Sequence, residues 1–143
     1  MKNVVLYLLS FLVLSCSVDT ENLQLPEVYF ISFTFNDITY VVTEYTVTID
    51  PIDEWNRMVE VPFDNASKTL RFTVEVEETN QMDTLLFEVD DVSWESDPTY
   101  GNRETSITKH TDSNMEGTFR VTFEDASGRE IYRFTNGVIH IEF

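Results

Sequence analysis

Residues 69–77, TLRFTVEVE, alternate apolar and polar side chains more regularly than any other stretch of this chain. A period of two residues places alternate side chains on opposite faces of a β-strand, so the stretch predicts a strand with one buried face. The predicted inward side chains are Leu70, Phe72, Val74 and Val76, and the predicted outward ones are Arg71, Thr73, Glu75 and Glu77. One-sided burial of this kind is typical of an antiparallel sheet.

Similar alternation, or a run of β-branched and aromatic residues, recurs along the rest of the chain from residue 27 onward. It predicts strands over residues 28–35, 38–50, 57–63, 69–77, 83–94, 105–110, 117–124, 130–135 and 138–143. After residue 27, no window long enough for a helix shows an apolar face at helical spacing. About eight or nine short strands predict an all-β fold: an antiparallel β-sandwich of the immunoglobulin-like or a similar type, with a small closed β-barrel as the alternative.

Turn chemistry marks two sharp reversals. Asn36-Asp37 and Asn136-Gly137 predict two-residue hairpin turns, because these residue types adopt left-handed backbone conformations readily. Asn136-Gly137 is the stronger of the two signals. We interpret Gly117, Asn136 and Gly137 as residues required by backbone geometry rather than as site residues.

Two other features limit the predicted strands. Pro62 has no amide hydrogen, so it predicts that residues 57–63 form an edge strand. Asp90-Asp91 interrupt the apolar pattern of residues 83–94 and predict a break or a bulge within one strand.

The first sixteen residues carry a targeting signal. Lys2 precedes the apolar run of residues 4–14, VVLYLLSFLVL, which matches the core of a secretory signal and is too short to span a bilayer. Residues 13–16, VLSC, resemble a bacterial lipobox and end in Cys16, the only cysteine of the chain. The resemblance implies cleavage before Cys16 and lipidation of that cysteine. An ordinary signal peptide cut at another bond is the alternative.

The domain organisation follows from this signal. We expect a lipoprotein signal peptide over residues 1–15, a lipidated cysteine and an acidic tether over residues 16–26, and a single β-sandwich domain over residues 27–143. Acyl chains on Cys16 would anchor the protein to a membrane. With Cys16 lipidated, no cysteine is left for a disulfide, so the stability of the domain depends on its apolar core.

Two further stretches resemble small cell-envelope lipoproteins of Bacteroidota, which are of uncharacterised function. They are residues 33–40, FTFNDITY, and residues 116–119, EGTF, followed by residues 134–138, FTNGV. The acidic tether resembles the signal that exports such lipoproteins to the outer cell surface, and a plain flexible linker is the alternative reading. The resemblance implies an outer-membrane lipoprotein of the cell envelope, with cell-surface exposure as a further expectation, and it implies no chemistry.

The charge balance narrows the class of partner. The formal net charge is −17 at pH 7, which argues against nucleic acid, whose phosphates require Lys and Arg. It argues equally against binding to anionic lipid surfaces. We expect the membrane contact to be made through Cys16, and the partner of the domain to be a protein or a glycan that the sequence does not identify.

Catalytic residues are hard to find in this chain. The two histidines, His110 and His140, both lie in predicted strands, and neither a nucleophile motif nor the ligand spacing of a zinc site is present. The chain is therefore predicted to be a binding or structural protein and not an enzyme. The alternative is a small envelope enzyme that acts on glycans through surface carboxylates such as Glu75 and Glu77, which lie roughly 6–7 Å apart along one strand.

Two sets of loop residues are candidates for binding. Asp50, Asp53 and Glu54 share one loop and could supply oxygen ligands to calcium, although they do not match a known calcium motif; otherwise no cofactor is predicted. Trp55, Trp94 and Tyr100 lie in or beside loops, where exposed aromatic side chains would mark a binding surface. Core packing of these aromatic residues is the alternative.

Overall fold

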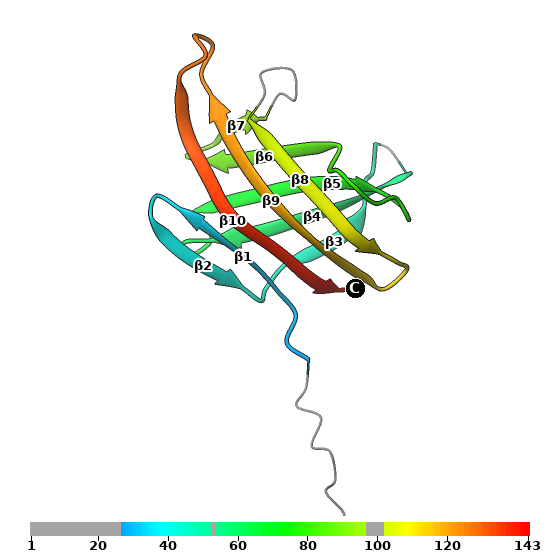
Figure 1. Cartoon of the computed structure of the whole chain (residues 1–143). Coiled ribbons are helices and arrows are strands. Elements are labelled where there is room, and N and C mark those ends of the chain that lie inside the picture. The colour runs from blue at the N-terminus through cyan, green and yellow to red at the C-terminus, as the bar shows by residue number, and fades with distance from the viewer. Residues whose placement is uncertain (1–26, 53, 97–101) are drawn as a thin grey trace, which may run out of the picture.

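Two antiparallel β-sheets make up the computed structural model, which describes residues 27–52, 54–96 and 102–143 (Figure 1). Sheet A contains, in spatial order, β2 (Ile38–Val42), β1 (Phe30–Phe35), β10 (Glu130–Glu142), β9 (Asn114–Glu124) and β8 (Arg103–His110). Sheet B contains β3 (Thr46–Ile49), β4 (Asn56–Phe63), β5 (Lys68–Glu75), β6 (Thr84–Val89) and β7 (Val92–Glu95). The predicted antiparallel β-sandwich is confirmed.

The connectivity is a meander. Strands that are consecutive in sequence pair with each other, except where the chain crosses from sheet A to sheet B after β2 and back again after β7. β1 and β10, the first and last strands in the sequence, pair with each other in the middle of sheet A. Because β2 does not pair with β3 and β7 does not pair with β8, the sheets stay open and the alternative of a closed barrel is wrong.

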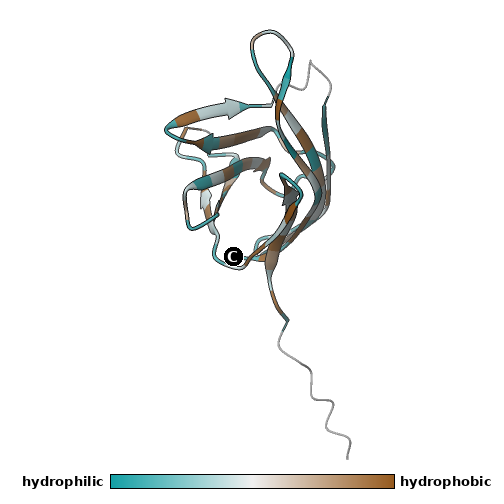
Figure 2. Ribbon diagram, turned by 90° about the vertical axis from the view of Figure 1, so that its left-hand side faces the viewer, coloured by the Kyte–Doolittle hydropathy of each residue, from teal (hydrophilic) through white to brown (hydrophobic). Residues whose placement is uncertain are grey.

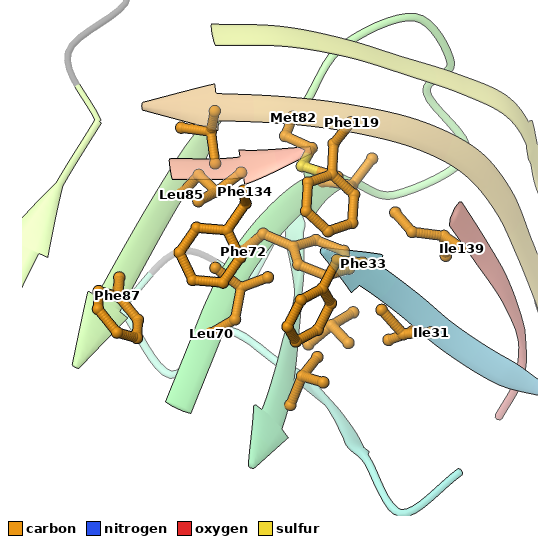
Figure 3. Packing of buried hydrophobic residues seen from close by; sticks show 14 of the residues in the cluster. Ile31, Phe33, Leu70, Phe72, Met82, Leu85, Phe87, Phe119, Phe134 and Ile139 are labelled. Atoms are coloured by element: carbon orange, nitrogen blue, oxygen red, sulfur yellow. The ribbon is translucent and has the colours of Figure 1, made fainter. Parts of the chain in front are cut away.

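The space between the sheets is filled by side chains. Apolar and polar positions alternate along the strands (Figure 2), and the apolar side chains meet in one cluster (Figure 3). Its largest fully buried members are Phe33, Phe72, Phe87, Phe123, Phe134, Ile31, Leu70, Met82, Leu85, Ile107, Met115 and Ile139. Burial of this apolar surface, at about 25 cal/mol per Å², supplies the main driving force for folding. The interior is therefore a packed core, and any ligand has to bind on the surface.

β5 follows the predicted alternation closely, with one exception. Leu70, Phe72 and Val74 are buried in the core, as predicted. Thr73, predicted to face outward, is also buried. Its hydroxyl is satisfied there by a hydrogen bond to the hydroxyl of Thr84 on β6, at 2.5 Å.

The predicted strand over residues 38–50 is in fact two strands that lie in different sheets. β2 ends at Val42 and β3 begins at Thr46. Between them, the hydroxyl of Tyr45 donates a hydrogen bond to the carbonyl of Glu142 and accepts one from its amide, at 3.1 and 3.2 Å. The crossover could not be recognised from the sequence, because residues 38–42 and 46–49 both have the β-branched composition of a strand.

The predicted strand over residues 83–94 is also two strands, joined by a two-residue turn. Asp90 and Asp91 have φ angles of 53° and 62°. These left-handed values are those of a hairpin turn whose twist matches the flanking strands. The predicted break at this position is confirmed, but the predicted single strand is wrong, since β7 folds back onto β6.

Pro62 does not mark an edge strand. β4 lies between β3 and β5, and Pro62 pairs with Thr69 of β5. The ladder between β3 and β4 extends only from Arg57 to Glu60. Pro62 is tolerated because it lies where β4 has a partner strand on one side only.

Asn136-Gly137 is a bulge and not a hairpin turn. β10 runs through it from Glu130 to Glu142 and pairs with β9 on both sides of it. The pairing shifts between Phe134 and Gly137, and Asn136 has a φ of 53°. The extra residue restores the inward orientation of the apolar side chains beyond it, which is the usual effect of a bulge. The Asn36-Asp37 turn, with φ angles of 48° and 63°, forms the predicted hairpin between β1 and β2.

Candidate functional site

The outer face of sheet A is hollowed along β8, β9 and β10, which lie side by side (Figure 1). Three hollows of about 490, 260 and 500 Å³ follow one another there. The first and second share Asn102 and Thr122, and the second and third share Glu104 and Arg120. Because neighbouring hollows share wall residues, they form one continuous surface, which we call the sheet A furrow.

The alternation of side chains along β9 determines which of its residues line the furrow. Thr118, Arg120 and Thr122 face outward, and they alternate with Phe119 and Val121, which are buried in the core. Side chains of β8 and β10, the strands on either side of β9, form most of the rest of the wall. Its polar members are Glu95, Asn102, Glu104, Thr105, Ser106, Thr118, Arg120, Thr122, Glu124, Asp125, Ser127, Glu130, Arg133, Thr135 and Asn136.

Two carboxylates of the furrow are paired with arginines of the furrow. Arg120 forms an ion pair with Glu104 across the β8–β9 ladder, and Arg133 Nη2 lies 2.5 Å from Glu130 Oε2. The side-chain amide of Asn102 donates to Glu124 at 2.7 Å. The furrow thus presents hydroxyls, amides, two arginine–carboxylate pairs and the further carboxylates of Glu95, Glu124 and Asp125. This surplus of carboxylates agrees with the net charge of −17.

The bulge in β10 lies at the third hollow of the furrow. At Gly137, an added Cβ would lie 2.5 Å from ring atoms of Phe119, so the ring fills the place of a side chain. An aromatic ring that covers a strand glycine in this way protects the exposed backbone at that point. Gly137, Phe119 and Val138 line the third hollow, and the Phe119 ring fills the core-facing space where a side chain at Gly137 would lie.

A rigid turn forms one end of the furrow. The carboxylate of Asp125 accepts hydrogen bonds from the amide and hydroxyl of Ser127, at 2.9 and 2.5 Å, and from the amide of Arg129 at 3.1 Å. These bonds, with the one from the Ser127 hydroxyl foremost, lower the pKa of Asp125 to about 2. Asp125 is therefore ionised at neutral pH and holds the β9–β10 turn, so its role is structural.

An aromatic pair lies beyond the other end of the furrow. His140 follows Val138 on the same face of β10, and its ring stacks on Tyr29 with centroids 5.3 Å apart. Its Nε2 lies 3.1 Å from a carboxylate oxygen of Glu27. These two rings lie near Val138, which lines the third hollow, but they are not themselves part of its lining.

Two of the three predicted aromatic candidates, Trp55 and Trp94, are described, and neither lines the furrow. Trp55 is exposed in the connection between β3 and β4. Trp94 lies on β7, is partly buried and packs edge-on against Tyr132 at a centroid distance of 5.9 Å. For Trp94 the core-packing alternative is correct. Tyr100 lies outside the described residues.

The predicted calcium loop shows ordinary turn geometry where it is described. The carboxylate of Asp50 accepts a hydrogen bond from the amide of Ile52 at 2.8 Å, and Glu54 is exposed. Asp53 lies outside the described residues. Over residues 27–52, 54–96 and 102–143, no group of three or more His, Cys, Asp or Glu side chains is arranged to hold a metal ion. This part of the chain therefore offers no built cation site.

The carboxylates considered for catalysis do not share a strand face. β5 ends at Glu75, and the chain turns at Glu77, whose φ is 64°. Both side chains are exposed. The spacing expected of a continuous strand does not apply to them.

His110 has a structural environment. It is buried at the end of β8, and its Nδ1 lies 3.1 Å from the carbonyl oxygen of Glu78, to which it donates. Burial lowers the pKa of His110, so the imidazole is neutral at pH 7 with its proton on Nδ1.

The furrow was not predicted from the sequence. The available signal was the row of Ser and Thr at the outward positions of residues 105–110 and 117–124, which ordinary solvent-facing strands also show. No helix in the described part of the chain is long and apolar enough to cross a membrane. Cys16 lies outside the described residues.

Comparison of the chain with protein-family models, with curated proteins and with solved structures finds no match. The fold and the surface define the class: an antiparallel β-sandwich with a filled core and a polar furrow across one sheet.

Proposed function

We propose that the protein is a lipid-anchored protein of the cell envelope that binds an extended, uncharged glycan in the sheet A furrow and does not catalyse a reaction. The observation that carries the binding role is the furrow itself, a continuous polar surface on a domain whose interior is packed. The support for the anchor is the sequence around Cys16, with its apolar run and lipobox resemblance.

The chemistry of the furrow supports the choice of a glycan. β9 is hydrogen-bonded on both sides, to β8 and to β10, so its backbone has no free groups for a ligand. A ligand must then bind to side chains, which here are hydroxyls, amides, two arginines and a larger number of carboxylates. Such groups hydrogen-bond a hydroxyl-rich chain, and the surplus of carboxylates disfavours an anionic one.

The dimensions of the furrow support a chain-like ligand. From Thr118 to Glu124, the outward residues of β9 extend over roughly 20 Å at about 3.3 Å per residue. A chain of several sugar units would make contacts along this length. The stacked rings of Tyr29 and His140 would contact a sugar beyond its end.

The carboxylates of the furrow support binding rather than hydrolysis. Glu104 and Glu130 each form an ion pair with an arginine. Because these carboxylate oxygens hydrogen-bond to guanidinium groups, they are engaged in holding the arginines in place.

The anchor is tested by metabolic labelling with a fatty-acid analogue. We expect the wild-type protein to be labelled and the Cys16→Ala protein to carry no label. We also expect protease treatment of intact cells to remove the wild-type domain. Absence of label from both proteins would disprove the anchor, and labelled protein resistant to the protease would place the domain on the inner side of the membrane.

The binding role is tested with neutral linear hexasaccharides based on glucose, xylose, mannose and N-acetylglucosamine, titrated into the full-length protein. We expect saturable binding of at least one of them, and at least tenfold weaker binding after Thr122→Arg, which fills the junction of two hollows.

The matched control for this variant is Thr48→Arg, the same change at an exposed threonine of sheet B. We expect the Thr48→Arg protein to bind the sugar as tightly as the wild type does. If none of the sugars binds, or if both variants bind equally well, the furrow is not the glycan site. Shortened sugars in the recovered ligand would instead support the alternative of a glycan-degrading enzyme.

A further inference from the structure

The outer edge of sheet A is open at β2. Within the described residues 27–52, 54–96 and 102–143, β2 pairs with β1 alone. The two strands pair without a bulge from Ile31 and Val42 to Phe35 and Ile38. Residues 38–43, ITYVVT, contain no charged residue and no proline. Charges, proline, bulges and short length are the usual means by which an edge strand avoids pairing with another chain. β2 has none of the first three.

The other edges of the sandwich are protected. At β8, the amide and carbonyl of Ile107 are hydrogen-bonded to Asn80, both at 2.9 Å, so the connection between β5 and β6 covers that edge. β3 and β7, at the edges of sheet B, are four residues long each. β2 is thus the edge at which another strand can be added most readily.

The hairpin geometry shows which backbone groups of β2 are free to pair. In a two-residue hairpin the residues that flank the turn, here Phe35 and Ile38, form a hydrogen-bonded pair, and such pairs alternate along the ladder. Ile38, Tyr40 and Val42 therefore bond to β1. Thr39 and Val41 direct their amide and carbonyl groups away from the sheet, and both residues are exposed, Val41 by 65%.

A groove with an apolar side and a polar rim lies beside this edge. This hollow of about 400 Å³ is lined by two kinds of residue: the apolar ones are Tyr40, Val41, Val42, Pro62, Phe63 and Ala66, and the polar ones are Thr43, Glu44, Asp64 and Asn65. Tyr40 and Val42 are on the core-facing side of β2. A strand added to β2 would place every second side chain over this groove and the others in solvent.

Acidic residues bracket the edge. Asp37 precedes β2 and Glu44 follows it, and both are exposed. Asp37 lies in the turn before β2 and Glu44 lies two residues after its end, so one carboxylate lies near each end of the strand. A segment of about eight residues with a basic side chain at each end would match both carboxylates. A second copy of this chain, with a net charge of −17, is a poorer match.

We propose that the β2 edge is a docking site for an extended segment of another protein, one that has alternating apolar residues and a Lys or Arg at each end. The segment would continue sheet A as a further strand, bonded to Thr39 and Val41, with its apolar side chains in the groove at Phe63. The site is separate from the sheet A furrow and does not depend on the proposed glycan function.

The test uses a fluorescent nine-residue peptide in which valine alternates with threonine between two terminal lysines. Its anisotropy is measured against the full-length protein. We expect saturable binding, at least tenfold weaker for the same peptide with terminal glutamates. Val41→Pro removes an outward amide and should also weaken binding at least tenfold. Ser93→Pro, at the equivalent outward position of the edge strand β7, should not.

A second variant covers the case in which Val41→Pro does not fold. Asp37→Asn combined with Glu44→Gln changes only two exposed side chains and should also weaken binding of the lysine peptide at least tenfold. Equal binding by this variant and the wild type, or no saturable binding at millimolar peptide, would overturn the proposal. A wild-type dimer in sedimentation that Val41→Pro abolishes would overturn it too, because the edge would then belong to a second copy.

Discussion

Replacement of Phe134 by alanine is expected to lower the free energy of unfolding by about 3–5 kcal/mol, the usual cost of removing a buried phenylalanine ring. Phe134 is fully buried on β10. Its ring lies 4.7 Å from that of Phe35, 5.1 Å from that of Phe87 and 5.3 Å from that of Phe33, centroid to centroid. These neighbours come from both sheets, so the ring joins the two layers (Figure 3). Alanine would leave a cavity that neither sheet can close alone.

Urea denaturation, followed by tryptophan fluorescence, measures this loss as a lower midpoint with an unchanged slope. Val138→Ala is the control, because Val138 lies on the same strand and is 38% exposed. Its effect should stay within about 0.5 kcal/mol. A loss below about 1 kcal/mol for Phe134→Ala would contradict the packing described for the middle of the core.

Gly137→Val is expected to lower the free energy of unfolding by about 2–3 kcal/mol, through overpacking rather than through a cavity. A Cβ at this position would lie 2.5 Å from two ring atoms of Phe119, which is itself buried. The ring cannot move away freely, because Phe33 lies on its inner side at a centroid distance of 6.3 Å. The larger side chain must therefore displace the ring into the core or open the ladder between β9 and β10.

A double-mutant cycle tests the cause. Phe119→Ala alone should destabilise the protein, but in the Gly137→Val background it should cost less than it does alone, because it removes the atoms that the valine strikes. Strictly additive losses would mean that Gly137 is required for its own backbone conformation and not for the space that Phe119 occupies.

Local patterns predicted much of the secondary structure. The alternation at Leu70, Phe72 and Val74 identified β5 and its buried face, and the Asn36-Asp37 turn was located correctly. Both features depend on a few consecutive residues, because side-chain alternation and left-handed turn geometry are properties of the local backbone.

Local patterns failed where the partner strand determined the outcome. Asn136-Gly137 has a stronger hairpin signal than Asn36-Asp37, yet it forms a bulge. A left-handed residue suits both structures. The difference is that β9 is long enough to pair with both halves of β10, so the chain gains more by continuing than by reversing.

For the candidate site, too, the sequence showed the residue types but not which of them come together. The aromatic and acidic loop residues were chosen by residue type, and Trp94 proved to pack on the core. The furrow consists of ordinary serine, threonine and charged residues that become a site only when β8, β9 and β10 lie side by side. No single one of these strands carries a distinguishing signal.

From its sequence alone, this protein can be assigned an all-β fold, the inward face of most strands, several turns and a strongly acidic surface, because each depends on residue type and on neighbours close in sequence. The sequence also carries the expectation of an anchor at Cys16. The crossover between β2 and β3, the bulge at Asn136, the sheet A furrow and the open β2 edge follow from strand pairing. Pairing joins residues far apart in the chain, such as Ile31 with Ile139, and a period of two shows which face is buried but not which strand lies beside it.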